Sequence, residues 1–258
     1  MLAVADLTLL RGGNRLVESF SHAFAAGNVH VVLGPNGAGK STLLLALAGM
    51  IKAESGDVNV VIRGAAARSV ASCSRQTLSQ LMAWQGDLPS AEFGLTVGQR
   101  LLLAAGDSPD EMRLCAAVDA MDIEGLQHRD MAALSSGERQ RVELAAIMQR
   151  DVPIWLLDEP TSHLDLRHQA AALAMLRREA ERGRLIVTVL HDLLQASSIA
   201  DEVLLLDGSG RVEAGAAKTL LTSQRASELF GLPVHVCTDG KGQPCLLPEF
   251  IGGNHETA

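Results

Sequence analysis

The stretch LGPNGAGKSTLL, residues 33–44, decides the fold of this chain. It places Gly34, Gly37, Gly39 and Lys40 between two apolar segments. Glycine loses more conformational entropy on folding than any other residue, so this cluster indicates a turn that requires a bare backbone. The apolar run VHVVL predicts a short buried strand over residues 29–33, and the apolar run after the turn predicts a helix.

The spacing of the glycines, Lys40 and Ser41 fits the pattern G-x-x-x-x-G-K-[ST] at every position. In such a loop the backbone N–H groups point inward, and the start of the following helix attracts negative charge. We predict a phosphate-binding loop in which Lys40 contacts the β- and γ-phosphates, Ser41 ligates Mg²⁺ and Thr42 lies beside the α-phosphate. The alternative is an ordinary glycine-rich turn between a strand and a helix. The candidate nucleotide ligands are Gly34, Pro35, Asn36, Gly37, Ala38, Gly39, Lys40, Ser41 and Thr42.

A second candidate half-site lies in IWLLDEP, an apolar run that ends in Asp158 and Glu159. Ligands of open α/β sheets bind at the carboxyl ends of the strands, where these two carboxylates are expected. We expect Asp158 to hold the metal through water, and Glu159 to orient or deprotonate an attacking water. The alternative is an ordinary acidic pair at the end of a strand.

The composition limits the kind of protein. With 258 residues, the chain fits one large domain or one domain with an insertion, and its net charge of −8 argues against general nucleic-acid binding. The four cysteines lack C-x-x-C or zinc-finger spacing, which predicts reduced thiols in the cytosol. The first ten residues lack a basic segment, and no apolar run approaches the roughly 18 residues of a membrane span. We therefore expect any membrane function to require a partner.

Strand and helix patterns alternate along the chain. Apolar strands are expected within residues 153–160 and 184–192, and helices within 164–182, before Gly183, and 193–201. This alternation predicts an α/β fold with a mainly parallel sheet and helices on both faces. The stretch DEVLLLDGSGRVEAG, residues 201–215, predicts a hairpin that turns at residues 207–210.

A helical insertion is predicted over residues 86–134. Its SPDE sequence predicts a capping box in which Ser108 is the N-cap of a helix whose apolar face is Met112, Cys115 and Val118. The predicted division is a single domain over 1–258, with a nucleotide-binding core (1–84 and 135–230), a helical subdomain (86–134) and a C-terminal tail (231–258) without clear periodicity.

Six segments occur in a characteristic order: GPNGAGKST, Gln85, LSSGERQR, LLDEP, TSHLD and LHD. Together they resemble the ATPase subunit of ABC transporters, over nearly the whole chain. The resemblance implies a P-loop NTPase fold of the ABC ATPase type, with a mainly parallel core, an antiparallel β subdomain and a helical insertion. It also implies a head-to-tail homodimer, in which each ATP lies between the phosphate loop of one chain and the signature motif of the other.

The resemblance assigns further roles. It implies that Gln85 senses the metal and the water beside the membrane partner, that Asp165 couples the two sites of the dimer, and that His191 contacts the γ-phosphate and the water. It also implies that Asp158 and Glu159 have the roles given above, and that Lys40 is catalytic. The signature that reaches the partner's γ-phosphate corresponds to Leu134, Ser135, Ser136, Gly137 and Glu138.

Each role has a structural alternative. Ser135 and Glu138 also fit a capping box, and Asp165 fits a helix cap. Gln85 and His191 could be ordinary loop residues. The chain departs from the family pattern at Ser136, where the signature normally has a second glycine, and at Arg11, which falls where an aromatic ring usually stacks on adenine.

The segments LLDEPTSHLDLRHQ, VLHDLLQAS and LFGLPVHV resemble the branch that powers bacterial import of iron–siderophore complexes, haem or cobalamin. This implies ATP and Mg²⁺ as cofactors, a polytopic permease as partner, an indirect link to a periplasmic binding protein, and no nucleic-acid partner. The implied location is the cytoplasmic face of the bacterial inner membrane. The alternatives are the ATPase of another ABC importer, a soluble ABC-type ATPase, and a nucleotide-binding module that does not hydrolyse ATP.

Overall fold

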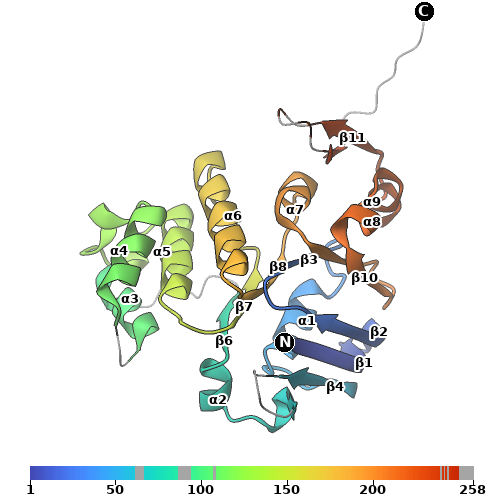
Figure 1. Ribbon diagram of the computed structural model, residues 1–258, viewed down its shortest axis with the longest axis horizontal. Helices are drawn as coiled ribbons and strands as arrows, with labels where there is room; N and C mark the ends of the chain where they lie inside the picture. The colour runs from blue at the N-terminus through green and yellow to red at the C-terminus, as the bar shows by residue number, and fades with distance from the viewer. Residues whose placement is uncertain are drawn as a thin grey trace, which may run out of the picture.

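The structure is a computed structural model that describes residues 1–61, 67–86, 94–106, 109–238, 240, 242 and 244–249. Within these residues the central sheet has six strands in the order β10-β9-β3-β8-β7-β6 (Figure 1). All neighbouring pairs are parallel except β9 and β10, which form the predicted hairpin. The strands are β3 (Val29–Leu33), β6 (Met82–Gln85), β7 (Ile154–Asp158), β8 (Leu185–Val189), β9 (Glu202–Leu206) and β10 (Val212–Ala216).

A smaller antiparallel sheet has the order β2-β1-β4-β5. The predicted α/β fold, with a mainly parallel core and an antiparallel β portion, is therefore confirmed. The strands of this sheet are β1 (Leu2–Arg11), β2 (Asn14–Phe24), β4 (Ser55–Val60) and β5 (Arg68–Ser69).

The central strands are apolar on both faces because both faces are covered. In β3, Val31 belongs to the core shared with the helices that follow β6, whereas Val32 belongs to the core shared with the antiparallel sheet and the helix after the phosphate loop. All five residues of β3, β7 and β8 are buried. This double burial explains why continuous apolar runs, rather than alternating patterns, predicted these strands.

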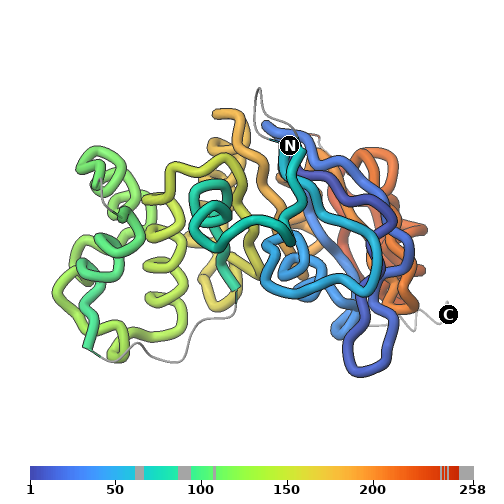
Figure 2. The backbone as a smooth tube through the Cα atoms, turned by 90° about the horizontal axis from the view of Figure 1, so that it is seen from below, coloured from blue at the N-terminus to red at the C-terminus, as the bar shows by residue number. Residues whose placement is uncertain are grey.

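The helices fall into groups. Figures 1 and 2 show α3, α4 and α5 together at one end of the molecule, with α1 and the antiparallel sheet toward the other end. Between the two groups lie α6 and β7. The helices are α1 (Lys40–Leu47), α2 (Arg75–Ser79), α3 (Val97–Ala105), α4 (Glu111–Ala120), α5 (Ser136–Met148), α6 (Leu166–Glu181), α7 (Leu193–Ile199), α8 (Ala217–Leu220) and α9 (Ser223–Phe230).

Helix boundaries agree only partly with the sequence predictions. Helix α6 ends just before Gly183, whose φ of 97° suits the predicted helix stop. For α4 the predicted cap was wrong: Asp110 is the N-cap and accepts a bond of 3.1 Å from the Arg113 N–H. Ser108 lies outside the described residues.

The apolar face predicted for α4 was wrong at Met112 and Cys115 and right at Val118. Met112 is 84% exposed and Cys115 is exposed, whereas Ala117 and Val118 are buried and Leu114 packs against the core. The helix begins later than the sequence predicted, and the face that packs against α5 includes positions 114, 117 and 118.

The tail has structure that the sequence did not predict. Strands β11 (Val234–Thr238) and β12 (Pro244–Pro248) pair as an antiparallel ribbon, and β12 packs against α7. Only Val234 and Leu246 of this ribbon are buried, so its alternation is too weak to be recognised. The division of the chain into core, helical subdomain and tail stays a prediction.

No helix within the described ranges is long and apolar enough to cross a bilayer. All four cysteines are free thiols.

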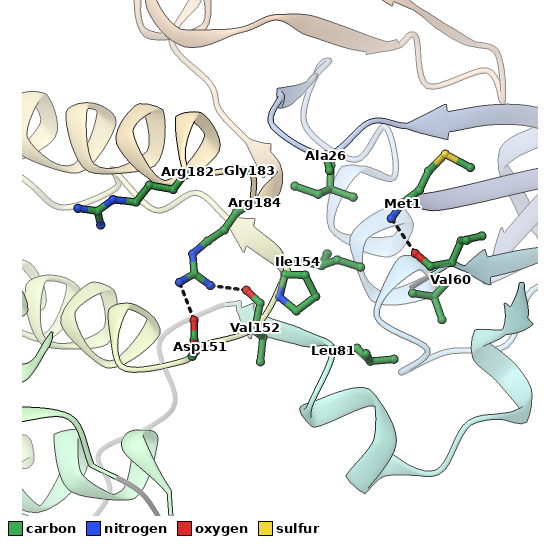
Figure 3. A pocket seen from close by; sticks show the side chains of 13 residues that line it. Met1, Ala26, Val60, Leu81, Asp151, Val152, Ile154, Arg182, Gly183 and Arg184 are labelled. Atoms are coloured by element: carbon green, nitrogen blue, oxygen red, sulfur yellow. Dashed lines mark hydrogen bonds and ion pairs between the residues drawn. The ribbon is translucent and has the colours of Figure 1, made fainter. Parts of the chain in front are cut away.

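A pocket of about 490 Å³ lies at the amino ends of β7 and β8 (Figure 3). Arg184 extends into this region and donates to Asp151 at 3.1 Å and to the carbonyl of Val152. Its Nε also donates to the buried Glu179 at 2.6 Å, and its guanidinium lies 5.1 Å from the centre of the Trp155 ring. These contacts assign Arg184 to the packing of the core rather than to binding.

We expect Arg184→Ala to lower the free energy of unfolding by about 3 kcal/mol, because it removes a partner of a buried carboxylate. The matched control is Arg182→Ala, which removes the other arginine on Glu179. The Arg182 side chain is 68% exposed, so its loss should cost less than about 1 kcal/mol. Urea unfolding measures both, and equal losses would contradict the structural role of Arg184.

Candidate nucleotide-binding site

The loop between β3 and α1 has backbone conformations that only glycine tolerates well. Gly34, Gly37 and Gly39 have φ values of 154°, 81° and 98°. A Cβ on Gly34 would lie 2.2 Å from the carbonyl oxygen of Leu206, so the neighbouring strand leaves no room for a side chain. The glycines thus let the chain turn tightly against β9 and enter α1 at Lys40.

Lys40 closes the loop from inside. Its ammonium group donates to the carbonyl of Gly34 at 2.8 Å and to that of Pro35 at 2.9 Å. Burial lowers the pKa of Lys40, and the nearby carboxylates of Glu159 and Asp158 act in the opposite direction. The structure thus places a buried amine between loop carbonyls and carboxylates, where phosphate oxygens could replace the carbonyls.

A cavity of about 400 Å³ opens at this loop. It brings six of the predicted phosphate ligands together with Glu159 and His191, which are more than 100 residues away in the sequence. The predicted ligands Gly34, Pro35 and Ala38 do not line it. The same rim includes Arg11, the residue placed at the adenine position. The cavity is lined by Arg11, Asn14, Leu16, Asn36, Gly37, Gly39, Lys40, Ser41, Thr42, Glu159 and His191.

Glu159 and His191 face each other in this cavity. Nε2 of His191 forms a hydrogen bond with Oε1 of Glu159, and both side chains are partly exposed to the cavity solvent. A carboxylate paired with an imidazole can orient a water molecule and accept its proton.

The backbone of Glu159 is held in a strained conformation, with φ of 51°. Its N–H donates to the Val189 carbonyl at 3.2 Å, while its own carbonyl accepts from the side chains of Gln140 at 3.3 Å and Ser162 at 2.8 Å. Gln140 also donates to Pro160 at 2.7 Å and is 2% exposed. Contacts from β8 and α5 therefore fix the direction of the Glu159 side chain.

Sequence reasoning missed Gln140 as a positioning residue. It stands in the middle of α5, and no local pattern shows that its amide reaches a loop 20 residues later. Asn14 and Leu16, on β2 at the cavity, were missed for the same reason.

Asp158 lies at the carboxyl end of β7, as predicted, and Gln85 lies at the carboxyl end of β6, a strand that the sequence analysis did not predict. Gln85 pairs with Leu157 in register, and it is 5% exposed. Neither its amide nitrogen nor its amide oxygen has a hydrogen-bond partner among the described residues. An unpaired buried polar group costs about 1–3 kcal/mol, so this amide indicates a site for a further ligand.

The signature residues lie away from this cavity. Ser135 caps α5: its hydroxyl accepts from the Glu138 N–H at 3.3 Å, and Glu138 accepts from the Ser135 N–H at 2.8 Å. The bond from the Ser135 N–H lowers the pKa of Glu138. Ser136 is exposed at the start of the helix, and a Cβ on Gly137 would lie 2.7 Å from the carbonyl of His163. The capping box is present, and the structure does not bring the signature to the phosphate loop of the same chain.

Asp165 is also a helix cap. It accepts from the N–H of His168 at 2.9 Å and contacts the imidazole of His168 at 2.8 Å. These bonds lower the pKa of Asp165. The residues that line the cavity do not include Asp165, Gln85 or Asp158.

The fold and this site define a P-loop nucleotide-binding protein, and the capped start of α5 is exposed at Ser135 and Ser136. The sequence profile of the family described as ABC transporter matches residues 17–162. The chain therefore belongs to the ABC transporter family, as one of its ATP-hydrolysing subunits.

Curated relatives match almost the whole chain. The hemin import ATP-binding protein HmuV of Rhodopseudomonas palustris is 34% identical over 95% of this chain and 94% of the relative. The protein of the same name from Streptomyces coelicolor is 38% identical over 92% of this chain and 85% of the relative. A solved metal-chelate type ABC transporter in an inward-facing conformation superposes with a TM-score of 0.79 at 25% identity, over 96% of this chain and 97% of that one.

We expect Gln140→Leu to lower the turnover rate of ATP hydrolysis by roughly 10- to 100-fold with little change in ATP affinity, because it releases the backbone of Glu159. Gln149→Leu is the matched control. Gln149 is a similarly buried glutamine at the end of α5, and its side-chain amide donates to the carbonyl of Ala145 in its own helix. Steady-state phosphate release measures both variants. Equal rates for the two variants would remove Gln140 from the positioning role.

Proposed function

We propose that this chain powers the import of a metal chelate through a membrane permease by hydrolysing ATP, with hemin as the first cargo to test. The observation that carries the ATPase part is the meeting of Lys40, Glu159 and His191 around one cavity. The names of the curated relatives and the metal-chelate transporter superposition support the cargo class. Iron–siderophore complexes and cobalamin remain alternative cargoes.

The residues present fit a magnesium–nucleotide complex. Ser41, Asp158 and Gln85 offer a hydroxyl, a carboxylate and an amide oxygen, which are the hard oxygen donors that Mg²⁺ prefers. The unpaired amide of Gln85 supports this assignment. When bound, Mg²⁺ would supply neutralisation of the phosphate charge.

Each side chain of the cavity would have its own role in ATP hydrolysis. Lys40, released from the Gly34 and Pro35 carbonyls, would hold the β- and γ-phosphates, and the loop N–H groups would bind the remaining oxygens. Glu159 would orient the attacking water and take its proton, while His191 would hold that water and the γ-phosphate. The strained backbone of Glu159 keeps this carboxylate directed into the cavity.

The signature supports a head-to-tail homodimer. The capped start of α5, with Ser135, Ser136, Gly137 and Glu138, offers a positive helix end without a phosphate loop nearby in its own chain. A second copy would supply that phosphate, and Asp165 would lie between the two sites. ATP would then favour the closed dimer because both chains contact each nucleotide.

The permease would bind near Gln85 and the helical region that contains α3 and α4, at the cytoplasmic face of the membrane. A periplasmic binding protein would be an indirect partner. The predicted division into core and helical subdomain fits this arrangement. The core would hold the phosphates, and the helical subdomain would transmit the closure of the dimer to the permease.

We expect Glu159→Gln to bind ATP with near wild-type affinity, to hydrolyse it at least about 100-fold more slowly, and to accumulate as a dimer, because it keeps the side-chain shape and loses the base. The control is Glu181→Gln, since Glu181 is an exposed partner of Arg177 on α6. Phosphate release and light scattering with Mg-ATP measure both properties. Wild-type turnover of Glu159→Gln would remove this residue from the base role.

The cargo can be tested in cells that lack this chain and receive iron only as hemin. Growth should return with the wild type and with Glu181→Gln, and should fail with Glu159→Gln. Restored growth only on a ferric siderophore, or a defect confined to cobalamin uptake, would contradict hemin as cargo and leave the ATPase assignment intact.

A further inference from the structure

Two histidines and a glutamate meet at the opposite edge of the central sheet from the nucleotide site. His22 lies on β2, His30 on β3 and Glu202 at the start of β9. One ligand atom from each lies within 4.8 Å of the other two. His22 Nε2 is 3.2 Å from the Glu202 carboxylate, and His30 Nδ1 is 3.7 Å from the same oxygen. Two sheets thus contribute to one cluster.

The hydrogen bonding of His30 fixes which of its nitrogens faces Glu202 with a lone pair. Its Nε2 contacts the carbonyl oxygen of Ala25 at 3.4 Å, and a carbonyl only accepts, so Nε2 carries the hydrogen. Nδ1 is then an acceptor directed at a carboxylate. His30 is completely buried, and neither its Nδ1 nor Nε2 of His22 has a hydrogen-bond partner in the described parts of the chain.

The three side chains direct polar atoms toward one another, and two of these atoms lack a hydrogen-bond partner among the described residues. The acceptor nitrogen Nδ1 of the completely buried His30 faces a carboxylate oxygen of Glu202 at 3.7 Å. Two acceptors that face each other in a buried site are stabilised when a cation lies between them.

We propose that His22, His30 and Glu202 form a binding site for a divalent transition metal ion of the Zn²⁺ type. Bonds of about 2.0–2.1 Å put donor atoms roughly 3.3 Å apart in a tetrahedral site, close to the 3.2 and 3.7 Å found here. Two imidazoles and one carboxylate leave a fourth position for water. The contact of His30 with Ala25 supplies the outer-shell bond that metal-binding histidines usually make.

The surroundings orient the ligands and leave an entrance. The His22 ring is packed edge-on against Phe24 at 4.7 Å between centroids and lies 5.9 Å from Phe20. The side chains of His22 and Glu202 are 14% and 24% exposed, so an ion can enter from the surface while His30 forms the floor.

The site is separate from the nucleotide site. His30 precedes Gly34 by four residues, or roughly 13 Å of strand, and it faces the antiparallel sheet. A bound ion would therefore join β2 of that sheet to β3 and β9 of the central one. This inference does not depend on the proposed transport function.

The test is titration of the untagged full chain with Zn²⁺, followed by calorimetry, and with Co²⁺, followed by visible absorption. One equivalent of Zn²⁺ should bind and raise the melting temperature, and Co²⁺ should give the bands of a four-coordinate nitrogen and oxygen site. His22→Asn and Glu202→Gln should each weaken Zn²⁺ binding by more than about tenfold, since loss of even an outer-shell partner costs that much. The control His128→Asn changes an exposed histidine and should bind as the wild type does.

Both test residues are partly exposed, and melting of the metal-free variants verifies that they fold. Equal Zn²⁺ affinity in the wild type and a folded His22→Asn variant would overturn the site. So would cobalt–thiolate absorption in the near ultraviolet, which would place the metal on a cysteine, or no binding of either metal.

Discussion

The rest of the site depends on the bond between the Lys40 ammonium group and the carbonyls of Gly34 and Pro35. This bond exists because Gly34 turns against Leu206 with no room for a side chain, which brings the start of the loop back over the start of α1. β3 then fixes the loop from below, and the neighbouring strands β7 and β8 deliver Glu159 and His191 to the same edge. One steric constraint between two strands therefore helps to bring an ammonium group, a carboxylate and a glycine turn to one cavity.

The sequence predicted those features that are encoded locally. The strands VHVVL and IWLLD, the glycine turn and the stop at Gly183 each rest on neighbouring residues whose chemistry has one good structural solution. The predicted cap of α4 was wrong because the helix begins at Glu111, where the side chain of Asp110 caps it. The tail ribbon was missed because so few of its side chains are buried.

The remaining features arise from contacts between residues far apart in the chain. Gln140 positions Glu159 only because α5 packs beside the loop after β7. The cluster of His22, His30 and Glu202 spans 180 residues and both sheets, so no spacing rule for metal ligands could find it. The two ends of the parallel strands thus differ: the glycine loop, Lys40 and Glu159 lie at one end, and the cluster of two imidazoles and a carboxylate lies at the other.

The most direct measurement is the equilibrium binding of Mg-ATP to the wild type and to Lys40→Ala, with Lys218→Ala as the control at an exposed lysine. We expect Lys40→Ala to weaken binding by roughly 10- to 100-fold, the loss of one or two charged hydrogen bonds to phosphate, and Lys218→Ala to bind as the wild type does. Equal affinity of the wild type and Lys40→Ala for Mg-ATP would contradict the central role of this loop. It would indicate that the nucleotide binds elsewhere on the molecule.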